Sequence, residues 1–241
     1  MTQLPGHAAT RGRREPMIKR SMNLLTNFWR TDRGLSLFLV VLLVVAFVVY
    51  PLRREALLND VALSAFYSLV LFSGVVSVTT RRRDRWIAGT VAAATLVFRW
   101  ASNIVPGKPV IVFSNVLTIV FLAMMAAVVL AQVFRKGPIT IHRIVGAVAA
   151  YVLLGIMWAE GYQLVALLTP GAFVASAGTP VGAPDLTYFS FVTLTTVGYG
   201  DVTAVNSVAR SMALLEALTG QLFPAILIAR LVSMEAARKL E

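Results

Sequence analysis

Cysteine is absent from this chain of 241 residues, and histidine occurs only twice, at His7 and His142. The absence of cysteine excludes disulfides and thiolate metal sites, and two distant histidines cannot form a local metal-binding motif. Charged residues make up only 14% of the chain, whereas a soluble domain averages about 25%. No nucleophile–base set is recognisable either, so the sequence predicts neither an enzyme nor a bound organic cofactor.

Long apolar runs dominate the chain instead. Hydrophobic residues reach 58%, and the mean hydropathy is +0.77. A helix needs about 20 mostly apolar residues to cross the hydrocarbon of a bilayer. Six segments have this character: 34–52, 61–80, 86–105, 109–134, 144–168 and 208–232. The predicted fold class is an all-α membrane protein with six transmembrane helices.

Lysine and arginine are distributed unevenly between these segments. If both ends of the chain lie on one side, the opposite side receives only Arg53, Arg54 and Lys108. The positive-inside rule then places the N- and C-termini in the cytoplasm of a multi-pass protein of the plasma or inner membrane. We therefore interpret the net charge of +11 as basic cytoplasmic clusters that contact anionic lipid, and not as a nucleic-acid interface.

Residues 195–201 read Thr-Thr-Val-Gly-Tyr-Gly-Asp. Gly198 and Gly200 adopt positive φ at little steric cost, so the backbone there can alternate in direction and point successive carbonyls toward one axis. The string resembles the selectivity filter of the potassium channel superfamily. The resemblance implies that K⁺ ions are bound by the filter residues Thr196, Val197, Gly198, Tyr199 and Gly200, through backbone carbonyls and the Thr196 hydroxyl.

The sequence on both sides of this string fits a pore module. Residues 185–194 are short and amphipathic and follow Pro184, and Asp185 is expected as the N-cap of a helix. Apolar sequence resumes at Val208. The resemblance therefore covers roughly residues 144–232, and it implies an outer helix, a turret loop, a re-entrant pore helix, a filter and an inner helix.

The filter string occurs once, whereas a pore lined by rings of carbonyls needs several loops around one axis. The resemblance implies four copies, and hence a homotetramer with bound K⁺ ions in the filter. The expected organisation has five parts: a basic cytoplasmic arm (1–33), a four-helix transmembrane bundle (34–134), a cytoplasmic linker (135–143), the pore domain (144–232) and a short cytoplasmic tail (233–241).

Several residues around the filter depart from the family pattern. Tyr188 and Phe189 stand where several relatives have paired tryptophans, and Val192 stands where some have a glutamate bonded to the filter aspartate. Asp201 must then be held by another group, for which Tyr188 and Arg210 are the candidates. The expected filter-support residues are Thr195, Asp201, Tyr188, Phe189 and Val192.

The last apolar segment contains a glycine and a proline one turn apart. Gly220 falls at the position of the usual hinge glycine of simple prokaryotic channels. Pro224 has no N–H, so the hydrogen bond that position 224 would donate to the Gly220 carbonyl is missing. This pair is either a gating hinge or a fixed kink that aids packing.

Two acidic residues lie inside apolar segments, where a carboxylate is costly and usually functional. Glu216 either faces the ion cavity or lies behind the filter, bonded to pore-helix hydroxyls such as those of Thr193 or Thr195. Glu160 raises the same choice. The buried role is slightly favoured for both.

The predicted function is a passive potassium-selective channel, and the alternative is a non-conducting regulatory or assembly subunit of a channel complex. Voltage-gated members of the superfamily carry Arg or Lys at every third position of the fourth span, but residues 109–134 contain neither, and Arg99 is alone in the third span. The first four spans thus occupy the position of a voltage sensor without its charges. Residues 233–241 are too few for a soluble ligand-binding domain.

We therefore expect conductance to depend weakly on voltage. A sensor with basic residues in its fourth span moves about 3–4 charges per subunit through the membrane field. Patch-clamp recordings of open probability against voltage give the gating charge of this protein, and several charges per subunit would contradict the prediction.

Overall fold

The computed structural model describes residues 32–49, 52, 57, 59–78, 82–105, 107–134, 140–176 and 178–238. Each predicted apolar segment lies largely in a long helix. These helices are α2 (Asp32–Val44) with its π-helical continuation η1 (Val45–Val49), α4 (Asp60–Val78), α5 (Arg82–Ile104), α6 (Lys108–Val133), α7 (Ile141–Leu168) and α9 (Ser207–Arg238). Most of the predicted N-terminal arm, residues 1–31, lies outside the described residues, as do 135–139 of the predicted linker.

Between α7 and α9 the chain forms a short helix and a small sheet. The helix is α8 (Ala183–Leu194), and the strands β1 (Phe173–Ala175) and β2 (Val202–Ala204) pair in antiparallel register, with Val174 opposite Thr203. The chain thus makes a short helix and returns through residues 195–201 before α9 begins. At the other end, α9 continues to Arg238, beyond the expected boundary at Val232, because residues 234–238 are mostly good helix formers.

Among the described residues, three helices are long and apolar enough to cross a membrane: Lys108–Val133, Arg143–Leu168 and Ser207–Ser233. Two shorter apolar helices cover Ser36–Val49 and Val61–Val76. α5 is in neither group, because it opens with a charged turn and contains Arg99 and Asn103. The chain is therefore a mostly helical membrane protein, and six crossings remain a prediction.

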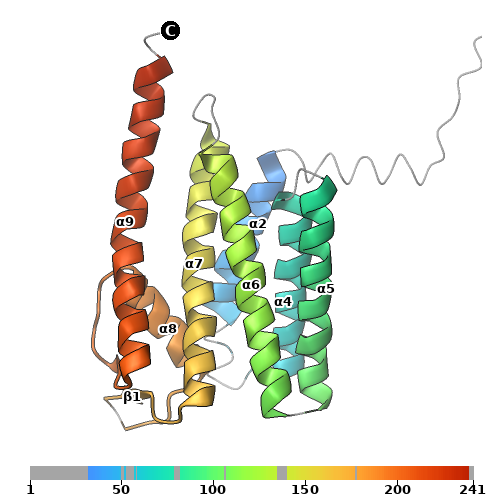
Figure 1. Cartoon of the computed structure of the whole chain (residues 1–241), viewed down its shortest axis with the longest axis vertical. Coiled ribbons are helices and arrows are strands. Elements are labelled where there is room, and N and C mark those ends of the chain that lie inside the picture. Colours follow the sequence, from blue (N-terminus) through green and yellow to red (C-terminus); the bar gives the residue numbers. More distant parts are fainter. Residues whose placement is uncertain are drawn as a thin grey trace, which may run out of the picture.

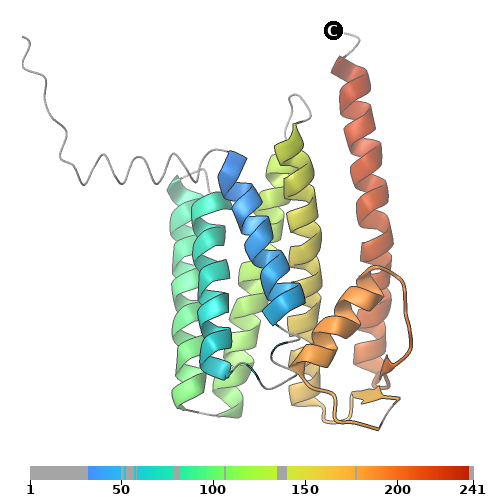
Figure 2. The same cartoon turned by 180° about the vertical axis from the view of Figure 1, so that it is seen from behind.

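The long helices run side by side and alternate in direction (Figures 1 and 2). α2, α4, α5 and α6 form a bundle along one side of α7, and α9 stands on the other side with α8 between them in the lower half of Figure 1. The starts of α5 and α7 lie at the same end of the molecule as the end of α9. The filter segment and the β1–β2 sheet lie toward the opposite end.

Two apolar clusters hold this arrangement together. The larger joins the bundle to α7, and its side chains Phe38, Phe121, Met125 and Leu153 are fully buried. The smaller one lies between α7, α8, α9 and the sheet, and contains Tyr162, Phe173, Leu186 and Phe189. α7 contributes to both clusters, so it is the wall that the bundle and the filter region share.

A buried polar contact also joins the bundle to α7. The Tyr67 hydroxyl of α4 donates a hydrogen bond to the Glu160 carboxylate, and Glu160 is fully buried. The Arg99 guanidinium of α5 lies 3.9 Å from the centroid of the Tyr67 ring, a cation–π geometry. Glu160 is thus placed between α7 and α4, on the side of α7 that faces the bundle.

We expect Tyr67→Phe to destabilise the protein by about 1–3 kcal/mol, because it removes the donor to a buried carboxylate and keeps the ring that Arg99 contacts. Chemical unfolding of the purified protein measures the change. The double variant Tyr67→Phe/Glu160→Gln serves as control, since it replaces the carboxylate by a neutral amide. Wild-type stability of Tyr67→Phe would show that this contact contributes nothing.

Candidate functional site

The backbone of the filter segment alternates in handedness. Thr196, Gly198 and Gly200 have φ of 59°, 58° and 79°, so every second residue lies in the left-handed region. The sequence predicted this freedom at the two glycines, but not at Thr196, where a β-branched side chain makes the conformation costly. Such strain persists only where the surrounding contacts impose it, and the surroundings of the loop supply those contacts.

The C-terminal turn of α8 holds the start of the filter. The N–H groups of Val197 and Gly198 both donate to the Val192 carbonyl, at 3.0 and 3.3 Å, and the Thr196 N–H donates to Thr193 at 2.9 Å. The Thr195 hydroxyl donates to the Phe191 carbonyl at 2.7 Å. The free carbonyls at the end of a helix are here used to fix the loop that follows. Val192 therefore supports the filter through its backbone, and not through its side chain.

The filter carbonyls themselves make no hydrogen bonds within the described part of the chain. No described donor reaches the carbonyl oxygens of residues 196–200. The side chains of Val197 and Tyr199 are 52% and 72% exposed. The five predicted ion-binding residues thus form one continuous loop with unpartnered carbonyls.

Asp201, at the end of the filter, has Tyr188 beside it. Their side chains interact electrostatically, and the Asp201 carboxylate accepts from the Val202 N–H at 3.1 Å. Arg210, the other candidate partner, instead donates from Nε to the Ala204 carbonyl at 3.1 Å.

Glu216 lies behind the filter, fully buried between three helices. Its carboxylate accepts a hydrogen bond from the Tyr162 hydroxyl of α7, and the Ser190 hydroxyl of α8 lies 2.5 Å away. Ser190 is also 2.7 Å from the Gly155 carbonyl of α7. The expected partners Thr193 and Thr195 were wrong for this carboxylate, because α9 meets α8 one turn nearer to the start of α8.

Gly220 marks the closest approach of α9 to α8. A Cβ atom at this position would lie 1.7 Å from the Leu194 carbonyl oxygen, which also accepts a hydrogen bond from the Tyr151 hydroxyl at 3.0 Å. Gly220 therefore has a packing role that the sequence did not reveal. Gly220 follows Glu216 by one turn, and Leu194 follows Ser190 by one turn, so both contacts share a single register.

Pro224 lies inside α9, which remains helical on both sides of it.

Two further predicted positions differ in detail. The N-cap of α8 is Gly182, and Asp185 is the third helical residue, whose carboxylate accepts from the Gly182 N–H at 2.9 Å. The predicted N-cap role of Asp185 was therefore wrong. The N-cap lies three residues earlier, at Gly182, because Pro184 is already part of the first turn of the helix. Phe189 packs against Tyr162 at 5.0 Å and Phe173 at 5.5 Å between ring centroids.

Comparisons with known proteins address this same part of the chain. A family model described as "Ion channel" matches residues 162–236. Over 84 residues the chain is 38% identical to "Two pore potassium channel c" of Oryza sativa subsp. japonica, a match that covers 35% of this chain and 18% of that protein. No solved structure matches.

Two bacterial proteins are similar as well. Protein LctB of Bacillus caldotenax is 42% identical over 67 residues, which cover 28% of this chain and 49% of LctB. Protein LctB of Geobacillus stearothermophilus is 38% identical over 77 residues, which cover 32% and 54%. The chain thus spans about half the length of the LctB proteins and less than a fifth of the plant protein. These matches show that the C-terminal segment of the chain, residues 162–236, is similar to ion channel proteins, among them a potassium channel.

Proposed function

We propose that this protein is a channel that conducts K⁺ selectively and passively across a membrane. The observation that carries the proposal is the loop at residues 196–200, whose backbone alternates in handedness and whose carbonyls lack hydrogen-bond donors within the described chain. In an assembled pore these carbonyls would be shielded from bulk water, and a buried carbonyl left without a donor is costly unless something else coordinates it. A partly dehydrated cation does so, and the carbonyls replace its hydration shell.

Ion binding is proposed at Thr196, Val197, Gly198, Tyr199 and Gly200. α8 ends at Leu194, directly before this loop, so the negative end of its dipole adds a favourable field for a cation that enters the filter. The residues proposed to support the loop are Thr195, Tyr188, Phe189, Val192 and Asp201, and hydrogen bonds of Val192 and Thr195 at the end of α8 support this proposal. No other cofactor is needed for passive conduction.

A homotetramer is the proposed assembly. One chain supplies one filter loop, and a ring of carbonyls requires several. The exposed side chains of Val197 and Tyr199 are apolar or aromatic, and α9 exposes Leu214 at 73%, Leu218 at 55% and Leu222 at 46%. Neighbouring subunits would cover these surfaces on the filter side, which supports assembly around α9 and the loop.

The proposed orientation puts the basic end of the bundle in the cytoplasm. Arg82, Arg83, Arg85 and Arg143 lie at the starts of α5 and α7, at the same end as the end of α9. The filter end then faces away from the cytoplasm, with both termini inside and the basic clusters near anionic lipid. Six membrane crossings, with the first four in the position of a voltage sensor, complete this proposal.

The proposed function is tested by ion flux into liposomes that contain the purified full chain. We expect K⁺ flux that greatly exceeds Na⁺ flux and is blocked by barium. Gly200→Ala is expected to lower K⁺ flux at least tenfold, because alanine is strained at a φ of 79°. Gly178→Ala is the matched control, since Gly178 also has positive φ, at 68°, but lies outside the filter.

Each outcome of this assay has a distinct meaning. Equal K⁺ and Na⁺ flux would contradict selectivity and point to a distorted filter. An absence of flux from a well-behaved tetramer, under varied voltage and pH, would favour the regulatory-subunit alternative. An equal loss of flux in both glycine variants would mean that backbone strain anywhere impairs the protein.

The hypothesis that Gly220 and Pro224 form a gating hinge is tested at Pro224 and not at Gly220. Gly220→Ala is expected to destabilise the protein by at least about 2 kcal/mol, because the added methyl group meets the Leu194 backbone. Pro224→Ala leaves that contact intact and returns an N–H to the helix. If α9 bends at 220–224 to open the pore, Pro224→Ala lowers open probability in single-channel recordings. Unchanged gating in Pro224→Ala would assign this pair to a fixed kink.

A further inference from the structure

The polar contacts around Glu216 form one chain of oxygen atoms that joins α7, α8 and α9. The Tyr162 hydroxyl of α7 contacts one carboxyl oxygen of Glu216, and the Ser190 Oγ atom of α8 lies 2.5 Å from the other. Ser190 Oγ also lies 2.7 Å from the Gly155 carbonyl oxygen of α7. All three side chains are fully buried. Four oxygen-bearing groups are therefore linked by three close contacts that bulk water does not reach.

Each of these contacts needs a proton. Two oxygen atoms approach to about 2.5–3.0 Å when a hydrogen atom lies between them, and without one their lone pairs repel. Tyr162 and Ser190 each carry one hydroxyl proton, and the Gly155 carbonyl carries none. Two protons cannot fill three contacts, so the third must come from Glu216. An ionised Glu216 would take the Ser190 proton and leave the contact between Ser190 and Gly155 without one.

No cation that would favour the ionised form is paired with Glu216 among the described residues. Its hydrogen-bond partners in that part of the chain are hydroxyl groups. The titratable side chains that face it there are Tyr151 and Tyr162, both of α7, and a phenol is neutral at physiological pH. Arg210, on the same helix, donates from Nε to a backbone carbonyl. A charged carboxylate among apolar helices without a paired cation is costly.

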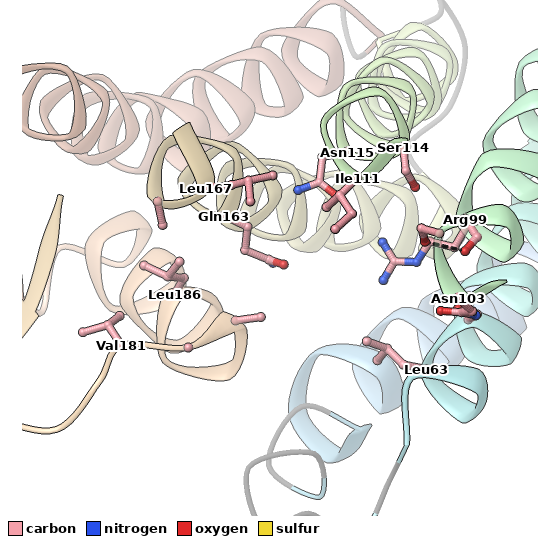
Figure 3. A pocket seen from close by; sticks show the side chains of 15 residues that line it. Leu63, Arg99, Asn103, Ile111, Ser114, Asn115, Gln163, Leu167, Val181 and Leu186 are labelled. Carbon is pink, nitrogen blue, oxygen red and sulfur yellow. Dashed lines mark hydrogen bonds between the residues drawn. The ribbon is translucent and has the colours of Figure 1, made fainter. Parts of the chain in front are cut away.

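Arg99, the arginine inside the bundle, contacts other groups. Its guanidinium lies 3.9 Å from the centroid of the Tyr67 ring and lines a polar cavity of about 380 Å³ between the bundle and the start of α8. Figure 3 shows Arg99, Asn115 and Gln163 in the wall of that cavity. Glu216 is not among the lining residues. The cavity therefore supplies no counter-charge to Glu216.

We propose that Glu216 carries a proton in the folded protein and donates a hydrogen bond to Ser190, which in turn donates to the Gly155 carbonyl. Tyr162 donates to the other oxygen of Glu216, so each contact holds one proton. Glu216 is then a neutral positioning residue. It fixes α8, whose last turn holds the start of the filter loop, and it adds no negative charge behind that loop. The inference goes beyond the proposed function and does not depend on conduction of K⁺.

The test is infrared spectroscopy of the purified full chain at neutral pH, because a protonated carboxyl group and an ionised carboxylate absorb in separate regions. We expect a band of a protonated carboxyl group that is lost in Glu216→Gln. The amide keeps the contacts, since its nitrogen donates to Ser190 and its oxygen accepts from Tyr162. Asp185→Asn is the matched control, because it removes a carboxylate of α8 that is bonded to the Gly182 N–H, and it is expected to leave the band unchanged.

Two hydroxyl variants report where the acid proton points. Ser190→Ala removes its acceptor, so the band is expected to move to higher wavenumber. Tyr162→Phe gives a second reading if Ser190→Ala fails to fold, because it removes the donor to the other oxygen and keeps the ring that packs on Phe189. A wild-type spectrum without the band, loss of an ionised-carboxylate band in Glu216→Gln, or a band that moves in neither hydroxyl variant would overturn the proposal.

Discussion

A loop that leaves its own carbonyls without hydrogen bonds cannot hold its shape by itself, and the packing of the C-terminal half depends on this constraint. The strain at Thr196 and the alternating glycines require outside support. The last turn of α8 supplies part of it, since the Val192 and Thr193 carbonyls accept from the first filter N–H groups. At the far end, the Asp201 carbonyl accepts from the Ser176 N–H, and Val202 pairs with Ala175 in the β1–β2 sheet. The loop is thus fixed at its start by α8 and at its end by the small sheet.

α8 in turn is fixed by two long helices. Gly220 lets α9 approach the Leu194 carbonyl, and Glu216 meets Ser190 one turn away. Tyr162 of α7 completes that polar contact and also packs against Phe189. A carboxylate buried by apolar helices is expensive unless it is bonded, so these partners also specify one register between the three helices. The acidic residue inside this apolar segment therefore serves to position the three helices relative to one another.

A second buried carboxylate, that of Glu160, lies on α7 itself, on the side opposite the filter region. Glu160 faces Tyr67 and the bundle, whereas Tyr162, two residues later, faces the filter region. The bundle lacks the basic residues of a voltage sensor, yet it is joined to the outer wall of the pore segment by this contact and by an apolar core. The polar cavity around Arg99 lies between the same two parts. Any influence of the bundle on the pore segment would pass through α7 and the start of α8.

The sequence by itself determined the helical membrane class, most limits of the long helices to within a few residues, and the loop at residues 195–201 with its short preceding helix. Apolar runs and a seven-residue string are local patterns, and local patterns are readable without a fold. Only the tertiary structure decided that Glu216 pairs with Ser190 and Tyr162, that Gly220 is a point of close approach, and that Arg210 donates to the Ala204 carbonyl. The partner of a buried polar group depends on where helices cross, and that register is set by the packing of side chains far apart in the chain.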